Sequence, residues 1–454
     1  MSEKESAAMA VGNVAGENLP ENNTPGNLPE TPLQKVKAFM QKYKVGEFFQ
    51  KYTMMIALVV VVMVFYFWEG KEKLILMPAN VTGLLTENAY VFVLATGMLL
   101  CILTGGNIDL SVGSVLCFAG GVGCILMKEG YNMWIAVIAS MLIGMAVGAF
   151  QGFWIAKVRV PAFIATLAGM YAFRGLSNTI MQGQRVIVTN KDFLQYFGTG
   201  KTSYIPDFIR KSNPELDKVF TKDNEFLTKI IGENFIKNFN VTCFCIGVLA
   251  ALIFIGFKIY TIISHHKLGI KQSIVGQIIS MILVSVLVIF ICFKLASSRG
   301  FPWVAVWVGL ILGIYAYVTN KTAIGRHLYA VGGNEKATAL SGVKTRNVYW
   351  FAYANIGLLA GFAGILGAGR GSGIEPVYGE GFEMDAIASC FIGGASAYGG
   401  TGKVSGMIIG ALLMGVINKG LMIVSIPINY RVVIKGAVLL IAVMFDVLSK
   451  RQKQ

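Results

Sequence analysis

The sequence predicts an all-α polytopic membrane protein. Hydrophobic residues make up 55% of its 454 residues and charged residues only 14%, whereas about a quarter of the residues in a soluble protein are charged. Apolar runs long enough to cross a bilayer recur from residue 52 to residue 447. Lys and Arg gather in short segments between these runs. The net charge of +15 therefore indicates the positive-inside bias of a membrane protein and not a nucleic-acid-binding surface.

The N-terminal part has two compositions. Residues 1–34 are rich in Glu, Asn, Pro and Gly and are expected to form a disordered acidic tail. Residues 35–51 are basic, which predicts a juxtamembrane segment and a cytoplasmic N-terminus. The first apolar run follows a long polar tail and does not have the form of a cleavable signal peptide.

Counting the apolar runs from that side predicts twelve crossings, with every short basic loop on the cytoplasmic face. Residues 181–240 then form a long external segment, and the basic tail 449–454 is cytoplasmic. The run 386–399 is too short for an ordinary membrane-spanning helix. The expected crossings are residues 52–68, 88–104, 107–127, 133–155, 161–180, 241–257, 273–296, 301–319, 347–368, 386–399, 404–424 and 430–447.

Two glycine-rich stretches interrupt the apolar pattern, one in each half of the chain. They are Thr104–Gly113 and Gly393–Gly400. Irregular backbone at membrane depth is tolerated only where protein buries it or where it lines a cavity, and interrupted spans in both halves are typical of transporters. The sequence therefore predicts broken or short helices near 104–113 and 386–400.

Asp109 is an acidic residue deep in an early apolar run. We prefer its interpretation as a helix cap, in which the carboxylate accepts backbone N–H groups together with Ser111 at the start of the following helix. The alternative is that Asp109 contacts a polar solute or holds the hinge of a gate.

The loop 321–346 is the longest polar stretch in the second half of the chain. It is basic, with Glu335 as its one acidic residue, which places it in the cytoplasm. Gly332, Gly333 and Asn334 form a helix-stopping turn, and residues 335–340 are good helix formers closed by Ser341 and Gly342. A short helix in such a loop indicates a docking surface for a cytosolic protein, and the alternative is a plain basic connection.

Glycines three or four residues apart indicate close helix packing in lipid. We expect contacts within the chain, although one face could serve a dimer interface. The seven cysteines lie inside apolar runs, which predicts buried structural residues and neither a disulfide framework nor a metal site. The glycines concerned are Gly144, Gly148 and Gly152, then Gly361, Gly364 and Gly367, and finally Gly406 and Gly410.

The sequence contains no recognisable nucleotide-binding site that could drive transport. The segment from Gly198 to Thr202 resembles the end of a phosphate-binding loop, but Gln195 stands where that loop needs its first glycine. No catalytic triad or metal cluster can be read, and His265, His266 and His327 lie in expected cytoplasmic loops. The sequence therefore predicts a transport subunit that is not an enzyme and holds no cofactor. A transporter driven by an ion gradient is the alternative, with Asp109 as its titrating carboxylate.

Several long motifs resemble the membrane permeases of bacterial monosaccharide ABC importers, in the branch that carries ribose, galactose and xylose. The resemblance covers roughly residues 52–448 and implies a transmembrane permease domain of about ten core helices. The extra pair in 241–296 is similar to the longer xylose-type or multiple-monosaccharide permeases. The motifs are LTGGNIDLSVGSV (103–115), VPAFIATLAGMYAFRGL (160–176), TAIGRHLYAVGGNEKATALSGV (322–343), MDAIASCFIGGASAYGGTGKVSGMIIGALLMGVI (384–417) and VIKGAVLLIAVMFDV (433–447).

This resemblance implies a homodimer in a bacterial inner membrane with both termini in the cytoplasm. A cytosolic ATPase, which would hold the ATP and Mg²⁺, is expected to dock on the loop 321–346. An external sugar-binding protein is expected to deliver a monosaccharide to the outer loops, where it could meet Glu375, Glu380 and Glu383. The expected coupling residues are Gly325, Arg326, Gly332, Gly333, Asn334, Glu335, Ala337, Ser341 and Gly342. The expected pathway residues are Asn107, Asp109, Ser111, Ser114, Thr166, Ser389 and Ser396.

Overall fold

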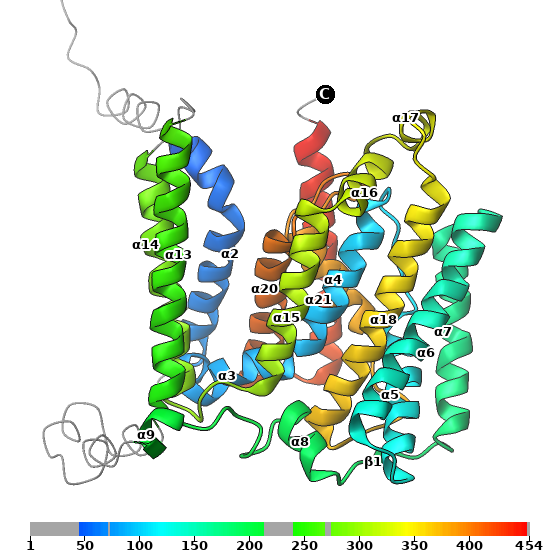
Figure 1. The fold of residues 1–454 in the computed structure, drawn as a ribbon, viewed down its shortest axis with the longest axis horizontal. Coiled ribbons are helices and arrows are strands. Elements are labelled where there is room, and N and C mark those ends of the chain that lie inside the picture. The colour runs from blue at the N-terminus through cyan, green and yellow to red at the C-terminus, as the bar shows by residue number, and fades with distance from the viewer. Residues whose placement is uncertain (1–44, 71–72, 213–238, 268–273, 452–454) are drawn as a thin grey trace, which may run out of the picture. The chain divides into compact units, whose positions relative to one another are not determined.

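The computed structural model describes residues 45–70, 73–212, 239–267 and 274–451, and this part of the chain is almost entirely helical (Figure 1). The predicted all-α class is therefore confirmed. The acidic tail 1–34, most of the basic segment 35–51, the middle of the segment 181–240 and the chain after 451 lie outside the described residues. The described residues from Thr53 onward belong to one compact unit.

The described helices and strands fall into two parts of the chain, one before and one after residue 240. The first part comprises α2 (Val45–Trp68), η1 (Leu74–Leu76), α3 (Pro78–Glu87), α4 (Ala89–Leu103), α5 (Val112–Lys128), α6 (Met133–Phe153), η2 (Trp154–Val158), α7 (Ala162–Ile180), β1 (Val186–Ile187), α8 (Lys191–Phe197) and α9 (Phe208–Ser212). The second part comprises α13 (Val241–Lys267), α14 (Ile274–Ala296), α15 (Trp303–Lys321), α16 (Ala323–Gly333), α17 (Glu335–Leu340), α18 (Thr345–Gly371), β2 (Gly373–Ile374), α19 (Phe382–Ile392), α20 (Val404–Ile423) and α21 (Ile428–Arg451).

The described residues contain six helices that are long and apolar enough to cross a membrane on their own. The bent pair α3–α4 makes a seventh span if it is counted as one. The other predicted crossings fall on helices that are shorter or less apolar, namely α2, α5, α7, α19 and α21. Each predicted apolar run thus overlaps a helix, and the count of twelve crossings stays a prediction.

Several helices extend further than the sequence suggests. Helix α13 continues to Lys267, beyond the expected crossing 241–257. The helix after Met133 continues beyond the expected crossing 133–155 as the π-helix η2, and the chain turns only at Arg159, whose φ is +69°. Charge marks where the apolar environment ends, but backbone hydrogen bonding can carry a helix beyond that point. Basic residues are therefore poor markers of helix ends in this chain.

Helices α4 and α18 form the centre of the described unit. Every residue of α4 is buried, and α18 packs against α4, α5 and α6. A helix that is apolar on all sides belongs in such a core. The polar breaks that follow α4 and α19 therefore lie next to the most buried helices of the molecule.

The close packing predicted for the glycine rows is confirmed, and it lies within the chain. A Cβ on Gly144 of α6 would lie 2.9 Å from the backbone N of Gly361 on α18, and one on Gly148 would lie 2.9 Å from the Cα of Gly357. Gly406 and Gly410 of α20 similarly face the backbone at the end of α19. These rows are covered by other helices of the same chain, so they do not form a dimer interface.

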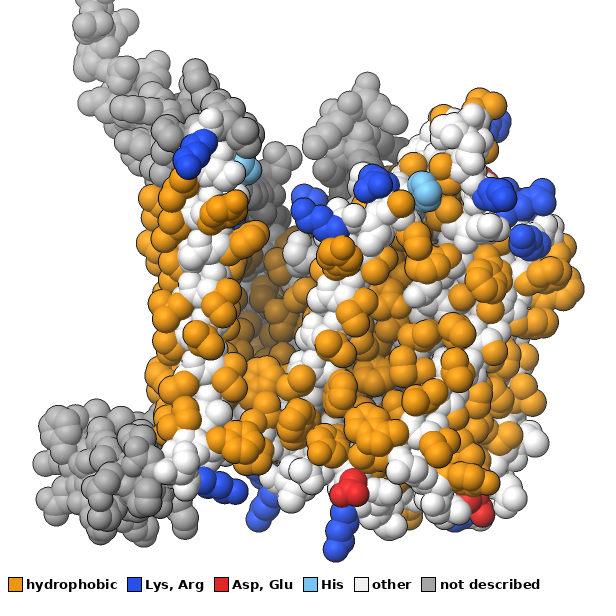
Figure 2. Space-filling model, viewed as in Figure 1, with side chains coloured by type: hydrophobic (Ala, Val, Ile, Leu, Met, Phe, Trp, Pro, Cys, Tyr) orange, Lys and Arg blue, Asp and Glu red, His pale blue; other side chains and the backbone are white. Residues whose placement is uncertain are grey.

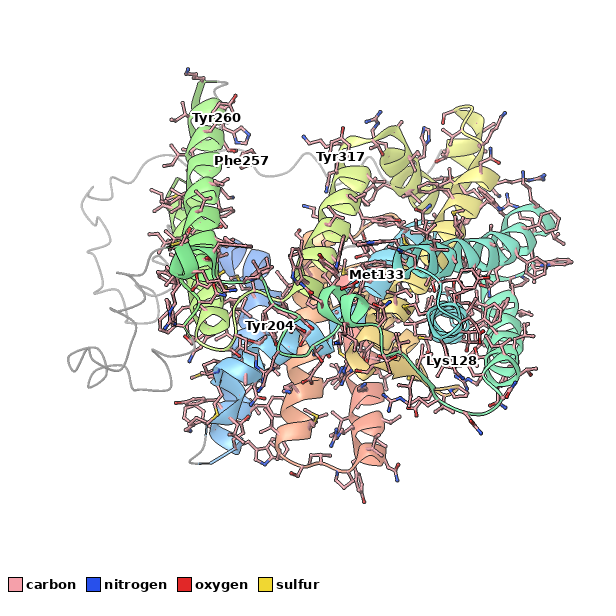
Figure 3. All side chains as sticks on the ribbon, turned by 60° about the horizontal axis from the view of Figure 1, so that its bottom comes forward. Lys128, Met133, Tyr204, Phe257, Tyr260 and Tyr317 are labelled. Atoms are coloured by element: carbon pink, nitrogen blue, oxygen red, sulfur yellow. The ribbon has the colours of Figure 1, made fainter. Side chains whose placement is uncertain are left out.

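The outer faces are apolar between two charged edges. Figure 2 shows a hydrophobic band, with the Lys and Arg side chains gathered at its ends. Large side chains stand out from the helices, among them Phe257 and Tyr260 on α13 and Tyr317 on α15 (Figure 3). Exposed aromatic and apolar side chains over such a band fit a surface that faces lipid. We call the two ends the α17 edge and the α8 edge, after the helices that lie there (Figure 1).

The extra helix pair is held at the α8 edge by caps. Helices α13 and α14 pack against each other, and α14 also contacts α3. Asn240 Oδ1 accepts the N–H of Cys243 at 2.9 Å, and Asp207 accepts the N–H groups of Val241 at 2.7 Å and Thr242 at 3.2 Å. Partial burial raises the pKa of Asp207, but the hydrogen bonds that it accepts outweigh this, so its pKa lies below the usual value. A carboxylate at a helix N-terminus is stabilising, and it ties the segment before residue 213 to α13.

Candidate functional site

The loop 321–346 folds into two short helices at the α17 edge (Figure 1). Thr322 Oγ1 accepts the N–H of Gly325 at 3.2 Å and begins α16. Asn334 separates α16 from α17, and its Oδ1 accepts the N–H of Ala337 at 3.0 Å. Helix α17 spans Glu335–Leu340, as predicted, and Gly342 follows it with a φ of +88°. Helix α16 was not predicted, and it buries Gly325, Leu328 and Val331 against the helices beneath.

Glu335 fastens α17 to two neighbouring parts of the chain. Its carboxylate accepts hydrogen bonds from Arg159 Nη2 at 2.8 Å, Tyr349 Oη at 3.0 Å and Thr345 Oγ1 at 3.1 Å. Partial burial raises the pKa of Glu335, but the hydrogen bonds and the Arg159 charge outweigh this, so its pKa lies below the usual value. The sequence suggested that Glu335 could pair with a partner protein. The carboxylate is engaged within the chain, and its pairing with a partner protein stays a prediction.

The outer face of α17 is free of contacts with the described chain. Ala337, Ala339 and Ser341 are exposed, and so is Lys336. Leu340 is 90% exposed, which makes it the most exposed of the large hydrophobic side chains that the structure describes. The predicted docking role of this helix stays a prediction, and the exposed leucine is a feature that burial against a partner would stabilise. The small residues of this face were expected from the sequence, whereas Leu340 was not.

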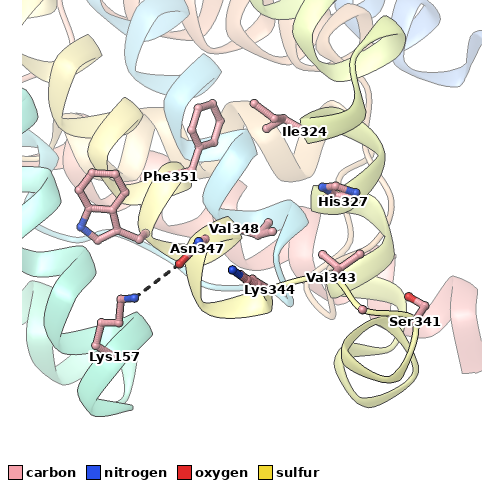
Figure 4. Close-up of a pocket in the computed structure, with 11 residues that line it drawn as sticks. Lys157, Ile324, His327, Ser341, Val343, Lys344, Asn347, Val348 and Phe351 are labelled. Carbon is pink, nitrogen blue, oxygen red and sulfur yellow. Dashed lines mark hydrogen bonds between the residues drawn. The ribbon is translucent and has the colours of Figure 1, made fainter.

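A groove runs beside α17 between α16, η2 and the start of α18 (Figure 4). We call it the basic groove. It has a volume of about 810 Å³, and Lys157 Nζ lies 3.5 Å from Asn347 Oδ1 within it. Its lining residues are Lys157, Ile324, His327, Ser341, Gly342, Val343, Lys344, Asn347, Val348, Trp350 and Phe351.

The two predicted breaks meet each other directly beneath α16. The N–H of Gly400 donates to the carbonyl of Leu103 at 3.1 Å, which joins the second break to the end of α4. A Cβ on Gly106 would collide with the carbonyl oxygen of Ala397, and one on Gly332 would collide with that of Leu103. Three backbones can approach this closely only because side chains are missing. We call this contact of Leu103–Gly106, Gly332 and Ala397–Gly400 the glycine crossing.

Helix α16 is also linked by a side chain to the segment that follows the second break. Tyr329 Oη donates to the carbonyl of Gly402 at 2.7 Å. The end of α16 therefore contacts both breaks, while α17 at its far side carries the exposed surface. A displacement of α17 would reach the two irregular stretches through one short helix.

The first break is closed by a buried polar network. Asp109 Oδ1 accepts from the N–H of Ser111 at 2.8 Å and from its hydroxyl at 2.6 Å, just before α5 begins. Ser111 Oγ lies 2.9 Å from the side-chain amide of Gln151 on α6, which packs against Gly169 of α7. The carboxylate thus accepts one local backbone N–H group before the helix. The cap interpretation is wrong, because Ser111 is the N-cap residue of α5 and no side chain of the described residues accepts an N–H group of that helix. Gln151 was not singled out from the sequence, because a single amide in an apolar run gives no pattern.

Two ion pairs, each with one buried partner, lie among α3, α4, α19, α20 and α21. Lys435 Nζ lies 3.0 Å from Oδ2 of the buried Asp385, which also accepts from Tyr90 Oη at 2.9 Å. The buried Lys419 has its Nζ 2.8 Å from Glu87 Oε1. A buried charge is tolerated when it is paired and hydrogen-bonded. Lys419 and Lys435 interrupt apolar runs, and this signal in the sequence was not used.

The loop before α19, which the sequence predicts to be external, closes over α5. Gly113 and Gly379 touch through their backbones, and Arg174 Nη1 lies 3.4 Å from Glu380 Oε1. Glu375 and Glu380 are exposed, as expected for an outer loop, but Glu383 is 7% exposed in the first turn of α19. Its expected place on the surface is wrong, because α19 begins earlier than the apolar run suggests.

The predicted pathway residues lie at several separate places in the described chain. Most are held by local hydrogen bonds: Thr166 Oγ1 donates to the carbonyl of Ala162 at 2.8 Å, and Ser389 Oγ to that of Asp385 at 2.6 Å. Asn107 and Ser396 flank the glycine crossing, and Asp109 and Ser111 lie in the network of the first break. Ser114 is buried by the outer loop. Their role in a pathway stays a prediction.

Comparison with known proteins gives a consistent result. The family model described as the permease component of branched-chain amino acid transport systems matches residues 80–443. The xylose transport system permease protein XylH of Escherichia coli K12 is 32% identical over 403 residues, covering 88% of this chain and 92% of the relative. The ribose import permease protein RbsC of the same strain is 30% identical over 376 residues, which cover 82% of this chain and 86% of the relative. XylH of Haemophilus influenzae is 29% identical over 405 residues, which cover 89% of this chain and 97% of the relative. No solved structure gives a significant match.

The glycine crossing makes a prediction about neighbouring positions in α16. Gly332→Ala should lower the stability by about 1–3 kcal/mol, the usual cost of overpacking, because the added Cβ meets the backbone of α4. Gly333→Ala is the matched control, because no atom lies within 4 Å of the added Cβ. The thermal melting temperatures of the two variants in detergent measure the difference. Equal melting temperatures would show that α16 does not press on the end of α4.

Proposed function

The chain belongs to the family of permease components of branched-chain amino acid transport systems, and from this premise we propose that it carries a monosaccharide in an ATP-driven importer. It is a multi-pass membrane protein and a transport subunit, not an enzyme. The sugar relatives support the substrate class, because both XylH and RbsC match most of the chain at about 30% identity. Xylose and ribose are therefore the first sugars to test.

The α17 edge faces the cytoplasm in this proposal. It carries most of the cations of the second half, including Arg326, Lys336 and Lys344, and cytoplasmic loops are enriched in Lys and Arg. Helix α21 ends at this edge (Figure 1), so the C-terminus is cytoplasmic on the same reasoning. The exposed Glu375 and Glu380 then belong to the opposite edge, where an external sugar-binding protein delivers the solute.

The single observation that carries the proposal is the braced and exposed helix α17. Leu340 and the small residues beside it offer a docking surface, and Glu335 ties that surface to Arg159 and α18. A cytosolic ATPase that holds ATP and Mg²⁺ docks here and supplies the movement. The force passes through α16 to the glycine crossing, where both breaks meet.

Two copies of the chain form the pathway in this proposal. The polar groups at the two breaks offer weak contacts to a sugar, and a pathway needs contacts that let the solute leave. Asp109 contributes as part of the network with Ser111 and Gln151. The solute therefore meets hydrogen-bonding groups whose geometry changes when the breaks move.

Uptake of radiolabelled xylose and ribose into proteoliposomes tests the proposal. We expect uptake only when the chain is combined with its ATPase, an external binding protein and internal ATP. Liposomes with a proton or sodium gradient and without the ATPase form the comparison. Uptake driven by that gradient would contradict the importer and would favour an ion-coupled transporter.

Removal of the protruding side chain of α17 should weaken the ATPase complex. Leu340→Ala is expected to reduce the affinity for the ATPase by about 30-fold, since a central interface anchor contributes about 2 kcal/mol. Val377→Ala, which removes another exposed apolar side chain from an outer loop, is the matched control. Co-purification and ATPase titration in detergent measure the affinity. Unchanged affinity for Leu340→Ala would remove α17 from the interface.

Removal of the Glu335 contacts should uncouple ATP hydrolysis from sugar uptake. Glu335→Ala loses the ion pair and all three hydrogen bonds, whereas Glu335→Gln keeps one acceptor oxygen, which can serve Arg159 and Thr345 at the Oε1 position or Tyr349 at the Oε2 position. We expect the sugar transported per ATP to fall in the order wild type, Glu335→Gln, Glu335→Ala, with ATPase binding retained. Glu129→Gln, at an exposed helix end, is the control. A simultaneous loss of ATPase binding would mean that Glu335 contributes to docking itself.

A further inference from the structure

The basic groove has an excess of positive charge. Lys157, His327 and Lys344 lie on three different elements around it, and no acidic residue is among its lining residues. The nearby carboxylate of Glu335 is occupied by Arg159. Within the described chain, the ammonium of Lys157 has only a neutral amide oxygen beside it, at 3.5 Å. The groove is therefore electrostatically complementary to an anion.

The groove also reaches into the apolar band. Its wall from α18 includes Trp350 and Phe351, which lie about 8 Å below the start of that helix at 1.5 Å per residue. Trp350 is 42% exposed and its indole N–H donates to the carbonyl of Ala149 at 3.1 Å, while Ile324 opposite is 41% exposed. Tryptophan at this depth is typical of the membrane interface. One end of the groove thus suits a charged group and the other an acyl chain (Figure 4).

We infer that the basic groove binds the headgroup of an anionic phospholipid, whose phosphate lies among Lys157, His327 and Lys344 and whose chains lie along Ile324, Trp350 and Phe351. Basic pockets between membrane helices on the cytoplasmic side are suited to such headgroups. The volume of about 810 Å³ exceeds what a single phosphate fills and falls in the range of sites for larger ligands. Because Ser341 and Gly342 form part of its wall, a bound lipid would also support the end of α17.

The test compares lipids on the intact chain without its partners. The purified protein is incubated in detergent with phosphatidylglycerol, cardiolipin or phosphatidylcholine, and native mass spectrometry and thermal melting report binding. We expect retained adducts and a raised melting temperature with the two anionic lipids only. The double variant Lys157→Ala/Lys344→Ala should lose both effects. Lys321→Ala/Lys403→Ala removes two exposed lysines outside the groove and is the matched control.

Each other outcome would overturn the inference. Equal effects of phosphatidylglycerol and phosphatidylcholine would show that charge does not select the lipid. Competition by glycerol phosphate at the same concentration as the lipid would identify a soluble anion as the ligand. Loss of the effect in both double variants would indicate a diffuse surface charge. If the protein forms dimers and these dimers do not bind the lipid, the groove would be assigned to contact with a second copy of the chain.

Discussion

Non-helical backbone inside a membrane has to find its hydrogen bonds within the protein, and the two broken stretches of this chain do so by contacting each other. The amide of Gly400 donates to Leu103, and Gly106 lies against Ala397. Each break therefore supplies partners for the other or is sealed by α16. The irregular stretches lie beside α4 and α18, the most buried helices, although Gly105, Gly394 and Tyr398 stay exposed.

The same constraint allows the breaks to change conformation when a neighbouring helix moves. A straight helix moves as a rod, but a stretch held by a few backbone contacts can change without unfolding its neighbours. Helix α16 ends on the glycine crossing, and Tyr329 holds the carbonyl of Gly402. Because Glu335 binds both the turn at Arg159 and α18, a force on α17 is shared between this short route and the longer helices. The proposed coupling surface and the polar breaks are thus linked by direct contacts within the chain.

Periodicity and composition predicted the helical class, both breaks and the bounds of α17, because these depend on local composition and on backbone preferences. Helix ends near charge were predicted poorly, since α13 and η2 continue past the apolar boundary. The partners of Asp385, Gln151 and Glu335 could not be predicted, because they are distant in the chain and depend on how the helices pack. Leu340 was missed for another reason: a leucine in a short helix usually indicates burial, and its exposure emerges only from the fold.

The two ion pairs around α19 and α20 explain how a helix assembly with broken spans stays in one arrangement. Asp385 lies at the start of α19, the short helix that leads into the second break, and Lys435 holds it from α21. Breaking one partner of such a pair would leave an uncompensated charge in a poorly solvated place, which is costly. The N-terminal end of α19 is therefore held by an ion pair, while its C-terminal end leads to the glycines of the crossing. If α17 moves as proposed, this ion pair would hold the far end of α19, and the change would fall on the break between them.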